Sequence, residues 1–164
     1  MEAQDIEIVL DPKQAFGTGH HAMTRMLLER LEDLVHGDES VLDVGAGSGI
    51  LARVALRLGA ASALGVACDP VAVDCARDYA TENGFGDNLE VRCGTLEEVD
   101  WQGELRPDLG LANLDRRTLL LLCDELAQYV RHGARLLLSG ILLDQEQEDC
   151  RGVLQGRCRV VSTA

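Results

Sequence analysis

Short apolar stretches and longer amphipathic stretches alternate along most of the chain. The short apolar runs predict β-strands at Ile6–Leu10, Ser40–Val44, Ala63–Val66, Leu89–Cys93, Leu109–Ala112, Arg135–Ser139 and Arg157–Val161. Helical periodicity fills the stretches between them, as in Ala22–Val35 and Gly49–Leu58, where apolar residues recur on one side. Strands that alternate with helices favour an α/β fold, with right-handed crossovers and a mostly parallel sheet covered on both faces.

Capping signals mark the ends of two of these helices. Asp69 and Pro70 combine an N-cap carboxylate with a proline at the first helical position, and we expect this helix to continue to about Asn83–Gly84. Gly59 provides a C-terminal stop for the helix before it. In doubly wound sheets ligands bind at the carboxyl ends of the strands, where the strand order reverses.

Three glycines, Gly45, Gly47 and Gly49, form the strongest local motif because they directly follow an apolar strand and precede a helix. Glycine allows positive φ and close approach of a ligand, and the helix start supplies unpaired N–H donors. A ligand-binding turn is therefore favoured over a tight turn without a ligand. A dinucleotide site prefers GxGxxG, and Ile50 stands where its third glycine belongs, which leaves NAD as a minor alternative; no Gly-Lys-Ser/Thr follows for a P-loop.

Composition and charge narrow the range of partners. The 164 residues, 46% of them hydrophobic, suffice for one core, so we expect a single domain, with residues 1–20 as an N-terminal strand and loop and 21–164 as the α/β core. A net charge of −13 argues against nucleic acid and anionic membranes and favours a basic protein partner, although the acidity has the simpler reading that it keeps the domain soluble. No charged-then-apolar leader and no apolar run of about 18 residues occurs, so a cytoplasmic location is expected.

The cysteines include no CxxC pair, so neither a zinc cluster nor a disulfide scaffold is predicted. The six cysteines are Cys68, Cys75, Cys93, Cys123, Cys150 and Cys158, and most of them fall inside apolar runs. We therefore expect small core residues in a reducing compartment, and no metal site.

Five segments resemble the PrmA family of class I, S-adenosylmethionine-dependent methyltransferases. They occur in order and without large gaps over about residues 6–150. This family methylates a large-subunit ribosomal protein. The segments are LDPKQAFGTGHH, VLDVGAGSGILARVALRLGA, CDP, LANL and SGILLDQ. The resemblance implies a Rossmann-like doubly wound sheet and S-adenosylmethionine as the cofactor.

Carried over by position, the resemblance also implies site residues. Gly45 and Gly47 would pass close to the methionine end of the cofactor, Thr24 would lie beside it, and the loop Phe16–Gly19 would close over it. Asn113, at the tip of the fourth predicted core strand, would orient the cofactor or the incoming nucleophile and is the candidate catalytic residue. The cofactor-binding candidates are thus Phe16, Gly17, Thr18, Thr24, Gly45, Gly47, Asp69 and Asn113.

Several of these candidates also have an ordinary structural reading. Thr24 fits a helix residue, Phe16 a core anchor, and Asn113 an N-cap or turn residue. Of the adjacent histidines only His21 matches the family pattern, and a hydrogen-bonded loop histidine is favoured over a base. Methyl transfer from a sulfonium needs mainly proximity and desolvation, so the lack of a conspicuous acid–base pair is expected.

The chain departs from the family pattern at two places near the expected site. Ala67 stands where the family has the acidic residue that holds the ribose hydroxyls, and Asp69 is expected to cap its own helix instead. Asp115, Arg116 and Arg117 replace small or apolar residues after Asn113, which puts charge at the mouth of the pocket or simply begins a solvated helix.

Two further departures are expected toward the ends. This sequence shows no counterpart of the family's separate N-terminal recognition domain and, after Arg157–Val161, no seventh strand. We expect either a fragment or minimal version of the fold, or a sheet edge covered by a partner, with a homodimer through that edge as the prediction. Three functions follow: a protein methyltransferase acting on a lysine or terminal amine, a small-molecule methyltransferase, or a catalytically silent methyltransferase-like binding protein.

Overall fold

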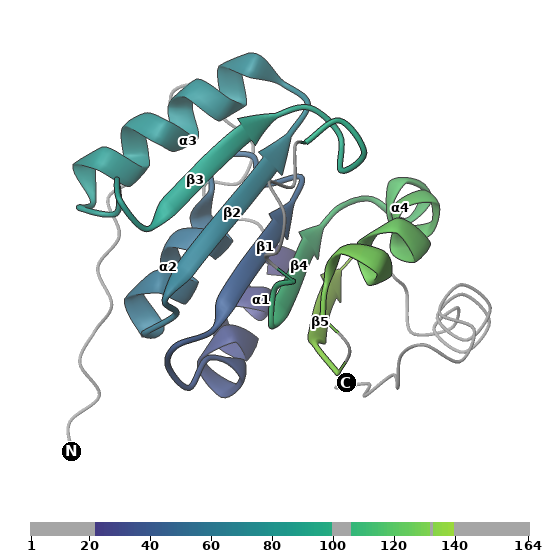
Figure 1. The fold of residues 1–164 in the computed structure, drawn as a ribbon, viewed down its shortest axis with the longest axis horizontal. Coiled ribbons are helices and arrows are strands. Elements are labelled where there is room, and N and C mark those ends of the chain that lie inside the picture. Colours follow the sequence, from purple (N-terminus) through teal and green to yellow (C-terminus); the bar gives the residue numbers. More distant parts are fainter. Residues whose placement is uncertain (1–21, 100–105, 132, 140–164) are drawn as a thin grey trace.

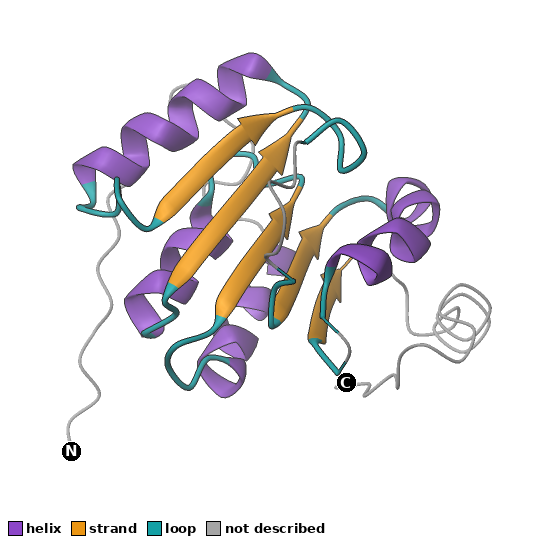
Figure 2. Ribbon diagram, in the orientation of Figure 1, coloured by secondary structure: helices purple, strands orange, loops and turns teal. Residues whose placement is uncertain are grey.

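The structure of the chain is a computed structural model that describes residues 22–99, 106–131 and 133–139. Helices and strands alternate along this part of the chain except between the third and fourth strands, where the described residues contain no helix (Figures 1 and 2). In chain order they are α1 (Ala22–Leu34), β1 (Ser40–Val44), α2 (Ile50–Leu58), β2 (Ser62–Ala67), α3 (Pro70–Glu82), β3 (Leu89–Cys93), β4 (Leu109–Asn113), α4 (Arg116–Tyr129) and β5 (Arg135–Ser139). The predicted α/β fold is confirmed, and β2 and β4 run slightly longer than their apolar runs indicate.

Several predictions concern segments outside the described residues. They are the first strand Ile6–Leu10, the loop Phe16–Gly19, the strand Arg157–Val161, and the missing last strand with its uncovered edge. These remain predictions.

The strands form one parallel sheet in the order β3-β2-β1-β4-β5. The chain winds outward from β1 to β3, and β4 then pairs with the other side of β1. Strand order therefore reverses between β1 and β4, and their carboxyl ends mark the place where such sheets bind ligands. The predicted mostly parallel, doubly wound sheet is confirmed for the described strands.

Two apolar clusters cover the two faces of this sheet. One joins α1, α2 and α3 to the sheet, and the other lies under α4, which occupies the opposite face from α1 and α2 (Figure 1). Strand residues alternate between them: Val41 packs in the first cluster, whereas Leu42 and Val44 pack in the second. The period-two alternation of a strand thus places residue 43 on the α2 side.

The predicted helix ends at α2 and α3 are confirmed. Gly59 ends α2 with φ 115, and its N–H donates to the carbonyls of Ala55 and Leu56. Asp69 is the N-cap of α3, and its carboxylate accepts from the N–H of Val71. No helix in the described residues is both long and apolar enough to span a membrane.

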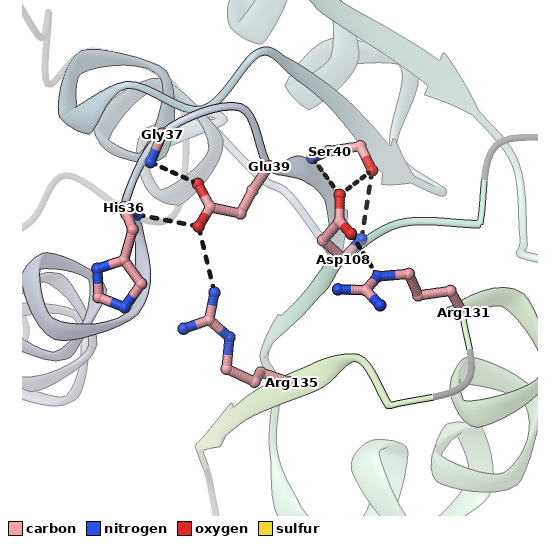
Figure 3. A network of polar contacts seen from close by, with 7 residues as sticks. All are labelled: His36, Gly37, Glu39, Ser40, Asp108, Arg131 and Arg135. Atoms are coloured by element: carbon pink, nitrogen blue, oxygen red, sulfur yellow. Dashed lines mark hydrogen bonds and ion pairs between the residues drawn. The ribbon is translucent and has the colours of Figure 1, made fainter.

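Two carboxylates, the buried Glu39 and the partly buried Asp108, tie the strands together at their amino ends (Figure 3). Glu39 accepts hydrogen bonds of 2.9 Å from the backbone N–H groups of both His36 and Gly37, and its other partner is Arg135 at 3.3 Å. Burial raises the pKa of Glu39, but these hydrogen bonds and the Arg135 charge outweigh burial and lower it overall. The loop after α1 is thereby fixed to β5.

Asp108 makes the equivalent link between β1 and β4. Its carboxylate accepts from the backbone N–H of Ser40 at 2.9 Å and from the Ser40 hydroxyl at 2.8 Å, and it also pairs with Arg131 (Figure 3). These partners lower the pKa of Asp108, with the backbone hydrogen bond from Ser40 as the largest cause. Both links lie at the opposite end of the sheet from the carboxyl edge.

Candidate cofactor-binding site

The glycine-rich turn lies at the carboxyl end of β1, beside the reversal of strand order. Gly45, Gly47 and Gly49 have φ values of 71, 53 and 71, all left-handed. The N–H groups of Gly45 and Ala46 both donate to the carbonyl of Val66, at 2.8 and 3.1 Å. The turn is thus held against the end of β2, and side chains with a Cβ would strain it at each glycine.

Gly45 also lies in close contact with the segment after β4. A Cβ at residue 45 would overlap the Cδ2 atom of Leu114. Val44 pairs with Ala112 in the sheet register, so Gly45 and Asn113 stand side by side at the tips of β1 and β4. The turn therefore packs so closely against Leu114 that residue 45 can carry no side chain.

Three polar side chains from distant parts of the sequence form a chain of hydrogen bonds at this edge. The Asn113 amide nitrogen donates to the Thr24 hydroxyl at 3.1 Å, and the Ser139 hydroxyl donates to the Asn113 amide oxygen at 2.6 Å. Thr24 and Ser139 are buried, with 1% and 7% of their surfaces exposed. The chain joins α1, β4 and β5, and it holds the Asn113 amide at both its nitrogen and its oxygen.

These hydrogen bonds bear on the structural alternatives that the sequence left open for Thr24 and Asn113. Asn113 is the last residue of β4 and not the N-cap of α4, because Asp115 has that role. Thr24 is more than an ordinary helix residue, since its buried hydroxyl accepts from the Asn113 amide. The two side chains that the resemblance links to the cofactor are therefore in contact.

Asp43 is a buried carboxyl directly beneath the turn, and sequence reasoning did not single it out. It accepts a hydrogen bond of 3.3 Å from the N–H of Ala52, in the first turn of α2, where the N-cap Gly49 offers no side-chain acceptor. Burial raises the pKa of Asp43 to about 7, although the Ala52 hydrogen bond acts to lower it. An acidic residue inside an apolar strand was the available signal.

Ser139 is the second residue that sequence reasoning missed. It closes a predicted strand and opens the SGILLDQ segment, but its role depends on the pairing of β4 with β5, in which Asn113 lies opposite Ser139. Only that pairing brings its hydroxyl to the Asn113 amide.

The tip of β2 offers no acidic side chain toward the turn. Ala67 is its last residue and is buried at 6% exposure, next to the Val66 carbonyl that holds the turn. Asp69 is exposed, and its Oδ1 atom accepts from the Val71 N–H at 2.9 Å. The Asp69 carboxylate thus caps its own helix, as expected.

Charged residues open α4 beyond Asn113. Asp115 caps the helix by accepting from the N–H and the hydroxyl of Thr118, at 3.2 and 2.6 Å. Arg116 and Arg117 are exposed on its first turn. Asp115, Arg116 and Arg117 therefore form the solvent-exposed start of α4.

The expectation that the cysteines are core residues is wrong for Cys68 and Cys93, which are exposed. Cys93 is the final residue of β3, and Cys68 is the first residue after β2. Both stand where the sheet meets solvent, so the apolar runs that precede them do not bury them. Within the described residues, no group of three or more His, Cys, Asp or Glu is placed to hold a metal ion.

Comparison with known proteins identifies relatives over nearly the whole chain. The model of the family described as ribosomal protein L11 methyltransferase (PrmA) matches residues 1–157. A ribosomal protein L11 methyltransferase of Deinococcus radiodurans is 46% identical over 143 residues, which cover 85% of this chain and 52% of that protein. The chain spans about half the length of the curated relatives it matches.

Solved structures show the same fold. A ribosomal protein L11 methylase from Lactobacillus delbrueckii subsp. bulgaricus superposes with a TM-score of 0.79 at 29% identity, covering 96% of this chain and 80% of the other. An RNA methyltransferase from Salinibacter ruber, in complex with S-adenosyl-L-homocysteine, superposes with a TM-score of 0.60 at 25% identity, covering 71% of this chain and 77% of the other.

Proposed function

The chain belongs to the ribosomal protein L11 methyltransferase (PrmA) family, and on that premise we propose that it binds S-adenosylmethionine and methylates an amine of a protein substrate, either a lysine or an N-terminus. One observation carries the proposal: the chain of hydrogen bonds Thr24–Asn113–Ser139 adjoins the left-handed glycine turn at the reversal of strand order. The turn exposes backbone without side chains, and the neighbouring Asn113 amide is held in place by hydrogen bonds. Together these features suit a small polar ligand.

The residues fit the cofactor at its methionine end. Gly45 and Gly47 would let the backbone approach it, because neither residue carries a side chain and both hold the left-handed conformation of the turn. Thr24 would donate its hydroxyl hydrogen to a carboxylate, and Asn113 would orient the reacting groups through the amide that Ser139 holds. Phe16, Gly17 and Thr18, from outside the described residues, would cover the site.

The fit is incomplete at the ribose. Ala67 has no acceptor for the ribose hydroxyls, and Asp69 is occupied in part by its own helix. Loss of a charge-assisted hydrogen bond costs roughly 1.5 to 3 kcal/mol, which corresponds to about 10- to 100-fold weaker binding. We therefore expect this chain to bind the cofactor more weakly than a relative with an acid at this position.

Bound S-adenosylmethionine would supply an electrophilic methyl group, so the protein itself needs little acid–base chemistry. The tasks left to the chain are to hold a neutral amine in line and to exclude water. Asn113 is the residue best placed for the first task. Its amide orientation is set by two hydrogen bonds, so no reorganisation is needed when substrate arrives.

A protein acceptor is favoured over a small molecule, because the matched relatives are named for a ribosomal protein. The net charge of −13 also favours a basic protein partner.

The test is titration calorimetry of the chain with S-adenosylmethionine and, separately, with NAD, followed by transfer of labelled methyl to purified ribosomal protein L11 and to a metabolite pool. Binding of S-adenosylmethionine with label in the protein supports the proposal. No heat with S-adenosylmethionine would favour the silent binding protein, and label in metabolites alone would favour the small-molecule alternative.

A further inference from the structure

The side chain of Leu114 connects the two sides of the candidate site. Leu114 directly follows Asn113, the last residue of β4, and its Cδ2 atom occupies the place that a Cβ of residue 45 would take. The Leu114 Cγ and Cδ1 atoms lie 3.3 and 3.7 Å from the same place, so all three of the nearest heavy atoms belong to this one leucine. The end of the Leu114 side chain therefore rests on the Gly45 backbone.

The glycine turn is held by β2 on its other side. The N–H groups of Gly45 and Ala46 donate to the Val66 carbonyl, at 2.8 and 3.1 Å. A Cβ at Gly65 would lie 3.1 Å from the Ala46 Cβ, so the turn also packs directly on the β2 backbone. These contacts limit movement of the turn toward β2, and the Leu114 side chain limits its movement toward β4.

Leu114 is itself held in a defined place. Its side chain is half-buried and packs against the apolar cluster under α4. Asn113, the residue before it, is hydrogen-bonded to Thr24 and Ser139. Asp115, the residue after it, is the N-cap of α4. Because closely packed side chains transmit a displacement to their neighbours, a change at Leu114 must reach the glycine turn.

We propose that Leu114 is a positioning residue, which acts through Gly45 to set the distance between bound S-adenosylmethionine and the amine that Asn113 orients. This role rests on the proposed function, in which the glycine turn contacts the cofactor. Reacting atoms must approach to about 3 to 3.5 Å in a productive geometry, and a 1 Å misplacement can cost about 100-fold in rate. A leucine of fixed size between the turn and the tip of β4 keeps these two groups in register.

Leu114→Ala tests this role, because it removes the atoms that rest on Gly45. With S-adenosylmethionine and ribosomal protein L11 both saturating, we expect kcat for methyl transfer to fall at least tenfold. The contacts with β2 remain, so the Kd for S-adenosylmethionine should rise by no more than about threefold. Leu114→Val, a smaller truncation, should give an intermediate loss of kcat.

Two further variants separate positioning from loss of stability. Leu114→Met retains a side chain of similar volume and should recover most of the rate. Leu122→Ala truncates another half-buried leucine of the same cluster, further along α4, and should leave kcat unchanged. Unchanged kcat in both Leu114→Ala and Leu114→Val, or an equal loss in Leu122→Ala, would overturn the positioning role.

A double-mutant cycle tests the contact itself without any cofactor. Leu114→Ala removes the atoms that overlap a Cβ at residue 45, so Gly45→Ala should cost less stability in that background than in the unchanged chain. Urea unfolding of the four chains measures this coupling, and additive losses would refute the contact. If the unchanged chain neither binds S-adenosylmethionine nor transfers methyl, the proposed function fails and the positioning role with it, whereas the unfolding cycle still decides the contact.

Discussion

Ser139 and Asn113 face each other across the tips of β5 and β4, and the Ser139 hydroxyl donates to the Asn113 amide oxygen at 2.6 Å. The same amide donates through its nitrogen to Thr24 at 3.1 Å. An asparagine amide can rotate by half a turn at little steric cost, so its orientation depends on its partners. In the observed orientation Ser139 holds the amide oxygen and Thr24 holds the amide nitrogen, so the two hydroxyls together restrict the rotation of the Asn113 side chain.

Removing the Ser139 hydroxyl should therefore weaken cofactor binding through Asn113. We expect Ser139→Ala to raise the Kd for S-adenosylmethionine about three- to tenfold, the worth of one neutral hydrogen bond. Ser139→Thr retains a hydroxyl and should recover most of the affinity. Calorimetry with both variants measures this difference.

A double-mutant cycle separates positioning from general damage. If Ser139 acts through the Asn113 amide, Ser139→Ala should have no further effect on Kd in an Asn113→Ala background. Additive effects of the two changes would mean that Ser139 contributes independently of Asn113.

The pattern of apolar residues along the sequence predicted the strands well, because helices bury these apolar residues on the faces of the sheet. The bounds of Ser40–Val44 and Arg135–Ser139 were predicted correctly, and β4 runs one residue further because Asn113 continues the ladder opposite Ser139. Apolar periodicity cannot say which polar side chains meet. The Thr24–Asn113 contact joins residues 89 positions apart and depends on the packing of α1 against the sheet edge.

The exposure of Cys68 and Cys93 was also beyond the sequence pattern. Cys93 is the last residue of β3 and Cys68 the first after β2, and their burial depends on whether another element covers the end of the strand. Conversely, the cap at Asp69 was predictable, because the Asp-Pro pair acts through local backbone geometry alone.

Ala67→Asp should tighten cofactor binding about 10- to 100-fold if the ribose lies at the tip of β2. The physical reason is a new charge-assisted hydrogen bond to the ribose hydroxyls. Ala67→Asn, which adds a neutral side chain of similar size, is the matched control and should give a smaller gain. Calorimetry at one ionic strength compares them, and an unchanged Kd in Ala67→Asp would place the ribose elsewhere.

Gly45→Ala should lower both stability and cofactor affinity. Its φ of 71 costs a Cβ-bearing residue about 1 to 2 kcal/mol, and the added Cβ also overlaps Leu114. Gly84→Ala is the control variant, because the φ of 77 at Gly84 imposes the same strain while a Cβ there meets nothing within 4 Å.

Urea unfolding should therefore show a loss in both variants that is larger for Gly45→Ala. Calorimetry should show at least tenfold weaker binding of S-adenosylmethionine for Gly45→Ala only. Normal affinity in that variant would mean that the turn does not contact the cofactor.

The buried carboxyl of Asp43 should give the stability of the chain a distinctive pH dependence. Burial raises its pKa from 3.8 to about 7 in the folded state. Between these two values the unfolded chain has lost a proton that the folded chain retains, so this group makes the free energy of unfolding fall as pH rises. Its contribution is fully present below about pH 4 and is lost by pH 7.

Asp43→Asn tests this assignment, because asparagine does not titrate yet can still accept from the Ala52 N–H. We expect the stability of the variant relative to the unchanged chain to increase from pH 4 to pH 7 by up to about 4 kcal/mol, and then to level off. Asp108→Asn is the control of opposite sign: the pKa of Asp108 is lowered, so the stabilisation it gives is lost as the pH falls. Urea unfolding of all three chains measures both slopes, the Asp43 slope between pH 4 and pH 7 and the Asp108 slope below the ordinary value of 3.8. A pH-independent difference between Asp43→Asn and the unchanged chain would mean that Asp43 is ionised throughout, and the charge beneath the glycine turn would then be a permanent feature of the site.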